Sequence, residues 1–350
     1  MSRRVVHIVP SLPPPPEGVG SFALTLAEAL RARHGIESRF LVAAPSRRAS
    51  GEIPALAIPR ATPEALSGAL EEATEGDGGA ETTVLLHYAN YGYEPRGCPS
   101  WLVDGLTGWK ARRRSRLVTV FHEVWASGPP WRSSFWLLPV QRRLAATLAR
   151  RSEALVTTLE IYAGMLRPWS CGREIAVLPV FSTVGEPAAV PPFGERARRI
   201  VVFGGAGVRS RAYGRFLPEL ARAARTLAAG EILDVGPPLP LPASAGGVPI
   251  RPLGVLPAGE VSELLLGAAG GFLAYPPDFL PKSTIFAAYC AHGALPICAW
   301  DRHPAAGAPY WTGTWTGTAD PAAVALAARR WYDGHSLARQ AVCFRELLAA

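Results

Sequence analysis

Lysine and asparagine are almost missing from this chain of 350 residues. Only Lys110 and Lys282 among its 36 basic residues are lysine, and Asn90 is its single asparagine. Lys282 and Asn90 both come just after apolar runs that predict strands. Because α/β proteins place their ligand contacts in the loops that follow strands, these two rare residues are candidates for binding a ligand.

Cysteine is scarce, and the chain has no long apolar segment. The five cysteines are odd in number and never form a CxxC pair, which argues against a disulfide framework and a structural zinc site. No apolar run reaches the roughly 18 residues that a membrane-spanning helix needs. We therefore expect a cytoplasmic protein in a reducing environment.

The chain is long enough for two domains, and the order strand, glycine-rich turn, helix begins twice along it. The apolar run 5–9 predicts a strand, and a glycine-rich turn and a helical pattern follow it. The same order begins again at residue 200. Between them, periodicity is lost and prolines gather. The sequence thus predicts an N-terminal Rossmann-like domain over 1–180, a linker over 181–198 and a C-terminal one over 199–330.

The stretch 253–300 predicts an anion site in the second domain. An apolar strand ends at Tyr275, and a proline-rich loop carries Lys282 to Ser283 and Thr284, which open a short helix. The first turn of a helix offers unpaired N–H groups and the positive end of its dipole. Lys282 adds a full charge beside them, so a phosphate is the expected ligand. The pattern GxxxxGK[ST] is absent, which excludes a P-loop NTPase.

This stretch also resembles a known family. The runs "LGVLPAGEVSELLLGAAGGFLAYP" and "AAYCAHGALPI" are similar to the donor-binding half of glycosyltransferase family 4. That family has the α/β GT-B fold, two Rossmann-like domains facing each other across a cleft. It transfers sugars from nucleotide diphosphates with retention of configuration. The family usually carries two glutamates across this loop and helix; here those places fall near Leu280 and Ala288.

The resemblance implies roles for several other residues. Gly18 and Gly20 match the family's first turn, beside acceptor and donor phosphate. The family neutralises the donor diphosphate with an arginine and a lysine after the first strand of its second domain. Arg209 and Arg211 lie there, at an expected helix start where cations oppose the dipole. The resemblance also implies that a final helix, within 331–350, crosses back to the first domain. No metal or cofactor is expected, since the nucleotide sugar is the substrate.

Two further groups follow strands of the first domain. His122 and Glu123 come at the end of the predicted strand 117–121 and resemble the family's strand-end pair, in which the histidine lies near the transferred sugar; a histidine satisfied within its loop is the alternative. Tyr88, Asn90 and Tyr91 follow another apolar strand. Tyrosine rings and an amide suit sugar recognition, although a packed aromatic turn accounts for them equally well.

A basic cluster lies near tryptophans in the first domain. It predicts peripheral contact with an anionic membrane surface at the inner face of the membrane, or binding of a lipid-linked acceptor; a solvated basic face is the alternative. No nucleic-acid-reading motif is present, so nucleic acid is not an expected partner. The cluster comprises Lys110, Arg112, Arg113, Arg114 and Arg116, with Trp109, Trp131 and Trp136 along the chain.

These observations together predict a glycosyltransferase that moves a sugar from a nucleotide-diphosphate donor to an unknown acceptor. Two other functions stay open. One is a non-catalytic GT-B module that binds a glycan or a phosphorylated ligand, or accompanies an active transferase. The other is a sugar-phosphate or nucleotide-sugar epimerase of the same architecture, for which no acid/base carboxylates can be assigned from the sequence.

Overall fold

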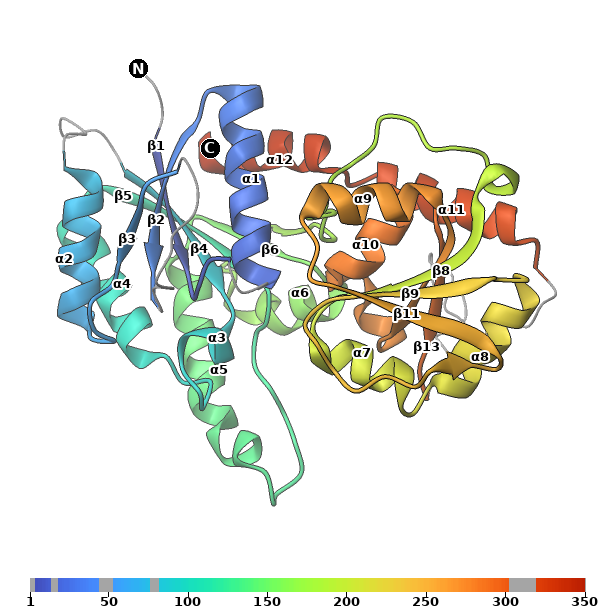
Figure 1. The fold of residues 1–350 in the computed structure, drawn as a ribbon. Coiled ribbons are helices and arrows are strands. Elements are labelled where there is room, and N and C mark those ends of the chain that lie inside the picture. The colour runs from blue at the N-terminus through green and yellow to red at the C-terminus, as the bar shows by residue number, and fades with distance from the viewer. Residues whose placement is uncertain (1–3, 14–17, 44–52, 76–81, 302–318, 350) are drawn as a thin grey trace. The chain divides into compact units, whose positions relative to one another are not determined.

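The computed structural model describes residues 4–13, 18–43, 53–75, 82–301 and 319–349 of the chain. It divides into two compact units (Figure 1). Unit 1 comprises Met1–Pro179 and Gln340–Ala350, and unit 2 comprises Val180–Arg339. Residues 340–350, at the far end of the sequence, therefore belong to the same unit as the first strand.

Unit 1 is built on a parallel sheet of seven strands in the described residues, in the order β3-β2-β1-β4-β5-β6-β7. Its middle strands are almost wholly apolar, as parallel strands covered on both faces must be. The order reverses between β1 and β4, which makes this pair the switch point of the sheet. The strands are β1 (Arg4–Val9), β2 (Glu37–Val42), β3 (Ala55–Ala57), β4 (Thr82–Tyr88), β5 (Ser115–Phe121), β6 (Ala154–Thr157) and β7 (Ile175–Val177).

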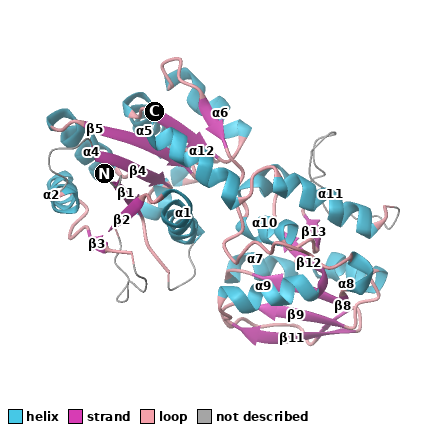
Figure 2. Cartoon of the chain, turned by 90° about the horizontal axis from the view of Figure 1, so that it is seen from above, coloured by secondary structure: helices cyan, strands magenta, loops and turns pink. Residues whose placement is uncertain are grey.

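Helices cover the sheet of unit 1 (Figure 2). Phe22 of α1 packs edge-on against Phe344 of α12, so these two helices lie together. Residues at the start of α2 explain why the helix begins there: Thr62 caps it by accepting the N–H of Ala65, and Pro63 is its first residue. The helices are α1 (Gly18–His34), α2 (Pro63–Thr74), α3 (Asn90–Tyr93), α4 (Ser100–Arg112), α5 (Ser133–Arg151), α6 (Glu160–Leu166), the 3-10 helix η1 (Arg167–Trp169) and α12 (Leu337–Ala349).

Unit 2 has six strands in the described residues, in the order β10-β11-β9-β8-β12-β13, and its switch point lies between β8 and β12. All its pairs are parallel except β10 with β11. The strands are β8 (Ala197–Phe203), β9 (Glu231–Val235), β10 (Ser244–Ala245), β11 (Val248–Gly254), β12 (Ala268–Ala274) and β13 (Leu295–Ala299). The helices are η2 (Phe193–Glu195), α7 (Ala206–Tyr213), α8 (Leu217–Thr226), α9 (Ala258–Gly267), η3 (Pro277–Lys282), α10 (Thr284–Ala291) and α11 (Pro321–Asp333).

The segment expected as a linker, 181–198, lies within unit 2. The buried guanidinium of Arg196 donates to the carbonyl oxygens of Pro191, Leu265, Ala268 and His292. Burial lowers the pKa of Arg196 from its usual value. These bonds join the irregular segment to the body of unit 2, so the chain passes from one unit to the other at Pro179 and Val180.

The helix expected to start at Arg209 and Arg211 is short, and a second helix follows it. α7 ends at Tyr213, where Gly214 follows with φ −95° and ψ −95°, and α8 begins at Leu217. Pro218 stands in the first turn of α8, where it needs no N–H; within one long helix it would remove a hydrogen bond and clash. The break moves Arg211 to the last turn of α7.

Candidate functional site

Each unit has one candidate site, at the carboxyl ends of the strands that flank its switch point. In unit 1 these ends lead into the loops after β1, β4 and β5, where Gly18, Asn90 and His122 stand. In unit 2 they lead into the loops after β8 and β12, which carry Gly204 and Lys282. Open α/β sheets bind ligands in such positions, because strand-end loops and helix N-termini converge there.

His122 does not stand alone in unit 1. Its Nε2 lies 3.2 Å from Nδ1 of His87, and Nε2 of His87 lies 3.2 Å from Nδ1 of His7. Nε2 of His7 in turn lies 3.2 Å from Oγ of Ser38. All four side chains are buried, and successive imidazole planes are within 14° and 20° of parallel. Three histidines and a serine thus form one continuous row.

The interior imidazoles of this row are neutral. Burial lowers the pKa of His7 to about 3. Burial also lowers the pKa of His87 well below its usual value, and the neighbouring His7 and His122 lower it further. Phe22 packs edge-on against His87 and His122, with ring centroids 6.0 and 5.0 Å away. Phe22 therefore covers both rings on that side.

The backbone holds His122 and Glu123 at the end of β5. Both N–H groups donate to the carbonyl oxygen of Tyr88, at 2.9 and 3.3 Å. His122 is 7% exposed, and Glu123 is partly buried. The strand-end location expected for both is therefore present, while the role of each stays a prediction.

Tyr88, Asn90 and Tyr91 are placed very differently from one another. Tyr88 is buried, packs edge-on against Phe121, and has a pKa raised by burial. Asn90 is also buried and donates to the carbonyl oxygen of Gly97 at 3.4 Å. Tyr91 is 39% exposed, and its hydroxyl accepts a hydrogen bond from Gln141. For Tyr88 and Asn90, the packed aromatic turn fits better than sugar stacking.

Orphan polar atoms mark this loop all the same. Among the described residues, the hydroxyl of Tyr88 and Oδ1 of Asn90 are buried with no hydrogen-bond partner. Leaving such atoms unpaired costs about 1–3 kcal/mol each, which makes them candidates for a small polar ligand. Gly18 and Gly20 lie elsewhere, in the first turn of α1. Gly18 is exposed, with open space where a Cβ would stand, and Gly20 is buried.

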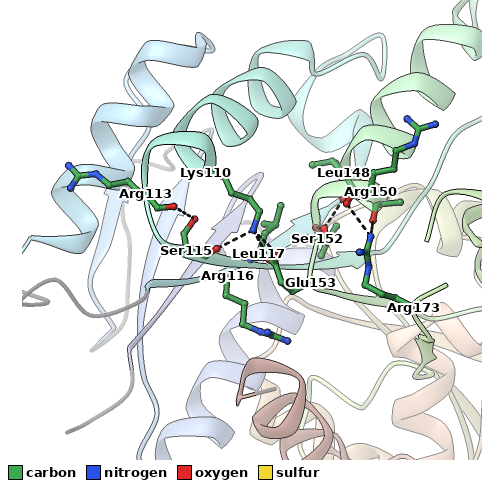
Figure 3. Close-up of polar contacts among 12 residues, drawn as sticks. Lys110, Arg113, Ser115, Arg116, Leu117, Leu148, Arg150, Ser152, Glu153 and Arg173 are labelled. Atoms are coloured by element: carbon green, nitrogen blue, oxygen red, sulfur yellow. Dashed lines mark hydrogen bonds and ion pairs between the residues drawn. The ribbon is translucent and has the colours of Figure 1, made fainter. Parts of the chain in front are cut away.

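Part of the basic cluster is bonded to other residues of unit 1, and Figure 3 shows these bonds for Lys110. Lys110 donates to both carboxylate oxygens of Glu153, at 2.6 and 2.7 Å, and to the carbonyl oxygen of Ser115. Arg116 donates twice to the carbonyl oxygen of Leu347 in α12. Trp109 is buried, so it cannot insert into a membrane. The cluster therefore offers less free charge than its sequence suggests.

A different surface of unit 1 combines arginine with exposed aromatic rings. On and just before α5, Trp131 is 83% exposed and Trp136 is 70% exposed, and Phe135 and Val140 are exposed beside them. Further along the same helix, a surface hollow of about 440 Å³ has no acidic residue in its lining. The hollow is lined by Leu138, Pro139, Arg142, Arg143, Ala146, Arg150 and Trp169.

In unit 2, the loops of the switch point are joined by a close contact. Gly204 directly follows β8 and has φ +124°, a conformation that favours glycine, and a Cβ there would meet Cδ1 of Ile285 at 2.5 Å. Ile285 is the second residue of α10. The first turn of α10 therefore lies against the turn between β8 and α7. Gly205 and Gly207 are exposed there, with open space where their Cβ atoms would stand.

Lys282, Ser283 and Thr284 lie at the start of α10 as expected. Lys282 ends η3, and Ser283 caps α10, its Oγ accepting the N–H of Phe286 at 3.2 Å. The Ser283 hydroxyl oxygen is therefore already used as the cap of α10. By helix geometry, the N–H groups of Thr284 and Ile285 are the other donors of the first turn. Backbone donors, the helix dipole and Lys282 together suit an anion.

Arg209 lies in the first turn of α7, but its side chain is buried inside unit 2. It is 1% exposed and donates to both carboxylate oxygens of Asp234, and to the carbonyl oxygen of Pro237 at 2.7 Å. Gly236 has φ +151°, and a Cβ there would meet the guanidinium. The charge of Arg209 is thus neutralised within the core, which removes it from the expected phosphate site.

Arg211 lies in the last turn of α7, not the first. The helix dipole favours a cation in the last turn. The position of Arg211 in the helix is therefore no longer an argument for an anionic ligand. Its guanidinium is exposed and lies 5.9 Å from the ring centroid of Trp300. The neighbouring Arg215 pairs with Asp301 at 2.6 Å.

Three remaining observations concern metals, membranes and cysteines. In the ranges described above, no three His, Cys, Asp or Glu side chains are grouped as metal ligands, because the histidine row is linear rather than convergent. None of the helices in those ranges combines the length and apolar character needed to cross a membrane. All five cysteines are free.

The fold is shared with known sugar-active enzymes. No protein-family model matches the chain, and no curated protein matches it in sequence. Among solved structures, the Escherichia coli trehalose-6-phosphate structure with UDP-2-fluoro glucose is similar with a TM-score of 0.57 at 11% identity, covering 99% of this chain and 98% of that one. WaaG, a glycosyltransferase involved in lipopolysaccharide biosynthesis, gives 0.56 at 12% identity, with coverage of 96% and 98%.

A UDP-N-acetylglucosamine 2-epimerase from Methanocaldococcus jannaschii is also similar, with a TM-score of 0.52 at 10% identity and coverage of 93% and 91%. These similarities over nearly the whole chain confirm the expected fold class, with two Rossmann-like domains of the GT-B type. At such low identity they establish the fold alone. The resemblance to the glycosyltransferases, first seen in residues 253–297, therefore extends to the whole chain at the level of the fold.

Proposed function

Taking the shared fold as the premise, we propose that this protein is a glycosyltransferase that uses a nucleotide-diphosphate sugar. Unit 2 binds the donor diphosphate in the loops after β8 and β12. Unit 1 binds the acceptor at the carboxyl ends of β1, β4 and β5. The comparison with a structure that holds UDP-2-fluoro glucose supports uridine as the nucleotide.

The observation that carries the proposal is the contact between Gly204 and Ile285. It brings a glycine-rich turn and the first turn of α10 together at the switch point of unit 2, where phosphate groups bind in open α/β sheets. Lys282 is one of only two lysines in the chain and immediately precedes this helix. A flexible ammonium group at that place can follow a phosphate whose charge grows as the glycosidic bond breaks.

In this reaction the protein stabilises the leaving group. Charge develops on the departing diphosphate in the transition state, and donors already aimed at that place favour the transition state over the ground state. In unit 1, His122 and Glu123 are the candidates for hydrogen bonds to sugar hydroxyls. We propose retention of configuration on the family resemblance alone.

We propose that α5, rather than the basic cluster, contacts the membrane that carries the acceptor. Trp131, Phe135 and Trp136 are exposed there, whereas Lys110 and Arg116 are occupied within unit 1. Tryptophan prefers the boundary between water and lipid, and the arginine-lined hollow further along α5 suits an anionic headgroup or a lipid phosphate. A lipid-linked acceptor would then be reached from the membrane surface.

An epimerase is the second candidate function, because structures of UDP-N-acetylglucosamine 2-epimerases share the fold. Such a reaction needs acid/base carboxylates near the sugar, and Glu123, which follows His122 at the end of β5, is one candidate. The two functions differ in their products: a transferase releases UDP when an acceptor is present, while an epimerase keeps the nucleotide sugar intact.

Binding is tested first by calorimetric titration with UDP, UDP-glucose and UDP-N-acetylglucosamine, with uridine as the control that lacks phosphates. We expect the diphosphates to bind and uridine to bind far more weakly. Equal affinity for uridine and UDP would contradict the phosphate site. Nuclear magnetic resonance of the incubated nucleotide sugars then separates epimerisation from hydrolysis or transfer, and binding with no turnover on any acceptor would favour a non-catalytic module.

A further inference from the structure

The hollow on α5 is built mainly from one face of that helix. Arg142, Arg143, Ala146 and Arg150 line it, and each lies three or four residues from another member of the set. This spacing places side chains on the same side of a helix. Ala146 has a side chain of a single carbon and is 3% exposed. The hollow therefore stays open between the arginines that precede and follow Ala146.

The three arginines of the hollow have no carboxylate partner. Across the described residues of the chain, none of their guanidinium groups forms an ion pair or a hydrogen bond. By contrast, Arg113 of the same unit pairs with Glu71. The helix dipole favours Arg150, in the last turn of α5, but not Arg142 and Arg143 in its middle. Like charges gathered on one face repel one another, so an anion bound among them lowers their electrostatic energy.

Two tryptophan rings hold Arg142 in place. Trp125 and Trp169 pack edge to face, with ring centroids 5.7 Å apart and planes at 74°. The guanidinium carbon of Arg142 lies 5.5 Å from the centroid of Trp125 and 5.8 Å from that of Trp169. Such contacts with aromatic rings order a guanidinium and use none of its N–H groups as donors to a carboxylate. Arg142 is therefore positioned in advance, with its N–H groups available to an anion.

The hollow borders the loop that follows β5. Trp125 lies in this loop, three residues after His122. Gln141, the buried neighbour of Arg142 on α5, accepts the N–H of Ala126 at 3.0 Å. These two contacts, one through an indole ring and one through a hydrogen bond, fix the middle of α5 against the loop. A group bound at Arg142 would therefore lie next to the segment that carries His122.

We propose that the hollow on α5 binds a phosphate group, with Arg142 as the anchor and Arg143 and Arg150 beside it, and that this phosphate belongs to the acceptor. The forked guanidinium matches pairs of phosphate oxygens, and a phosphomonoester brings about two negative charges to the three arginines. The assignment to the acceptor rests on the proposed function, in which unit 1 binds the acceptor near His122. The phosphate site itself does not depend on that function.

Fluorine nuclear magnetic resonance reads this site directly. The chain has ten tryptophans, so protein made with 5-fluorotryptophan gives a sparse spectrum. Trp125→Phe and Trp169→Phe assign the two signals beside Arg142. We expect glycerol 3-phosphate to move both signals along a saturable curve, whereas glycerol, which lacks the phosphate, leaves them in place. If neither signal moves along a saturable curve, the proposal is overturned.

Two variants separate the hollow from the net charge. Arg142→Gln removes the anchoring guanidinium from an exposed position and should weaken the binding of glycerol 3-phosphate about tenfold or more. Ala146→Leu fills the hollow without changing any charge and should also weaken binding. The matched control is Arg113→Gln, which removes the same charge outside the hollow and should leave the affinity within about twofold. Equal affinities in Arg142→Gln and Arg113→Gln would overturn the proposal.

Vesicles distinguish a lipid phosphate from a soluble one. Co-sedimentation compares phosphatidylcholine vesicles that contain phosphatidic acid, a phosphomonoester, with vesicles that contain phosphatidylglycerol, a phosphodiester. A preference for phosphatidic acid that is lost in Arg142→Gln identifies the phosphate of a lipid headgroup as the ligand. Without such a preference, Arg142-dependent binding of glycerol 3-phosphate identifies a soluble phosphorylated molecule.

A UDP titration separates this inference from the proposed function. Arg142→Gln should bind UDP within about twofold of the unsubstituted protein, because the proposed donor site belongs to unit 2. Binding of UDP without binding of glycerol 3-phosphate would leave the proposed function standing and overturn the phosphate site of unit 1. The reverse result would support the phosphate site and count against the proposed function.

Discussion

Arg209 and Asp234 form a buried ion pair in unit 2, in which the guanidinium donates to both carboxylate oxygens and both side chains are 1% exposed. The residues are 25 positions apart, on α7 and β9. A guanidinium and a carboxylate held in this forked arrangement satisfy each other without water. The pair therefore belongs to the structure of unit 2, although Arg209 alone resembles a ligand-binding residue.

We predict that Asp234→Asn destabilises unit 2 by about 3–5 kcal/mol, because it leaves the Arg209 charge buried without a counter-charge. The matched control is Asp301→Asn, which breaks the exposed pair of Arg215 and Asp301, whose side chains are 68% and 44% exposed. That change should cost less than about 1 kcal/mol. Chemical unfolding followed by tryptophan fluorescence measures both, and similar losses in the two variants would refute the assignment.

The proposed donor site predicts that Lys282→Ala weakens UDP binding about tenfold or more, because it removes a charge beside the diphosphate. The chain supplies its own control in its only other lysine, since Lys110 pairs with Glu153 in unit 1. Lys110→Ala should leave UDP affinity within about twofold. Calorimetric titration of both folded variants decides, and a Lys282→Ala protein with undiminished affinity would exclude this site.

His122→Gln should lower turnover by about a hundredfold while UDP affinity changes little, since His122 belongs to unit 1 and the proposed phosphate site belongs to unit 2. Steady-state rates of UDP release and a UDP titration are compared on the same preparation. Parallel losses of turnover and affinity would mean that His122 acts through the fold or faces the nucleotide.

The buried histidines predict a pH dependence of stability. Burial lowers the pKa of His7 to about 3 and that of His87 well below its usual value. Below about pH 6.5 the unfolded chain binds protons that the folded chain refuses, so the free energy of unfolding falls as the pH is lowered. Each such histidine contributes about 1.4 kcal/mol per pH unit below 6.5, until its folded pKa is reached.

His7→Gln should therefore reduce this slope by about 1.4 kcal/mol per pH unit between pH 6 and 5. Phe40→Leu alters the ring that stacks on His7 at 4.8 Å but adds and removes no titrating group. It should shift the stability curve downward with an unchanged slope. Urea unfolding at several pH values measures the slopes, and equal slopes in His7→Gln and the unsubstituted protein would argue against a neutral buried His7.

The surface of α5 predicts salt-sensitive binding to vesicles that contain anionic lipid. Replacing Trp131 and Trp136 by serine should weaken this binding about tenfold or more, because both rings are exposed and can enter the lipid interface. Reversing Arg112 and Arg113 should have a smaller effect, since they contact Ser67 and Glu71. Co-sedimentation at low and high salt compares them, and no binding at low salt would favour a soluble acceptor.

The order of strands and helices was largely predictable, because apolar runs and glycine-rich turns mark the units locally. Pro218 could also have predicted the break between α7 and α8. The burial of Arg209 was not predictable, since it depends on a carboxylate on another strand. The same holds for the histidine row: His7 and His87 each look like an isolated polar residue in an apolar strand. Only the register between strands shows that they reach one another and His122.

The return of residues 340–350 to unit 1 has a consequence for synthesis on the ribosome. Unit 2 is one continuous stretch, Val180–Arg339, and its last residue is made before the closing helix of unit 1 is complete. Phe344 meets Phe22 of α1 only after that. The sequence of unit 1 is therefore begun first and finished last, and a chain that ends near residue 339 would contain the whole sequence of unit 2 and a first unit still missing part of its core.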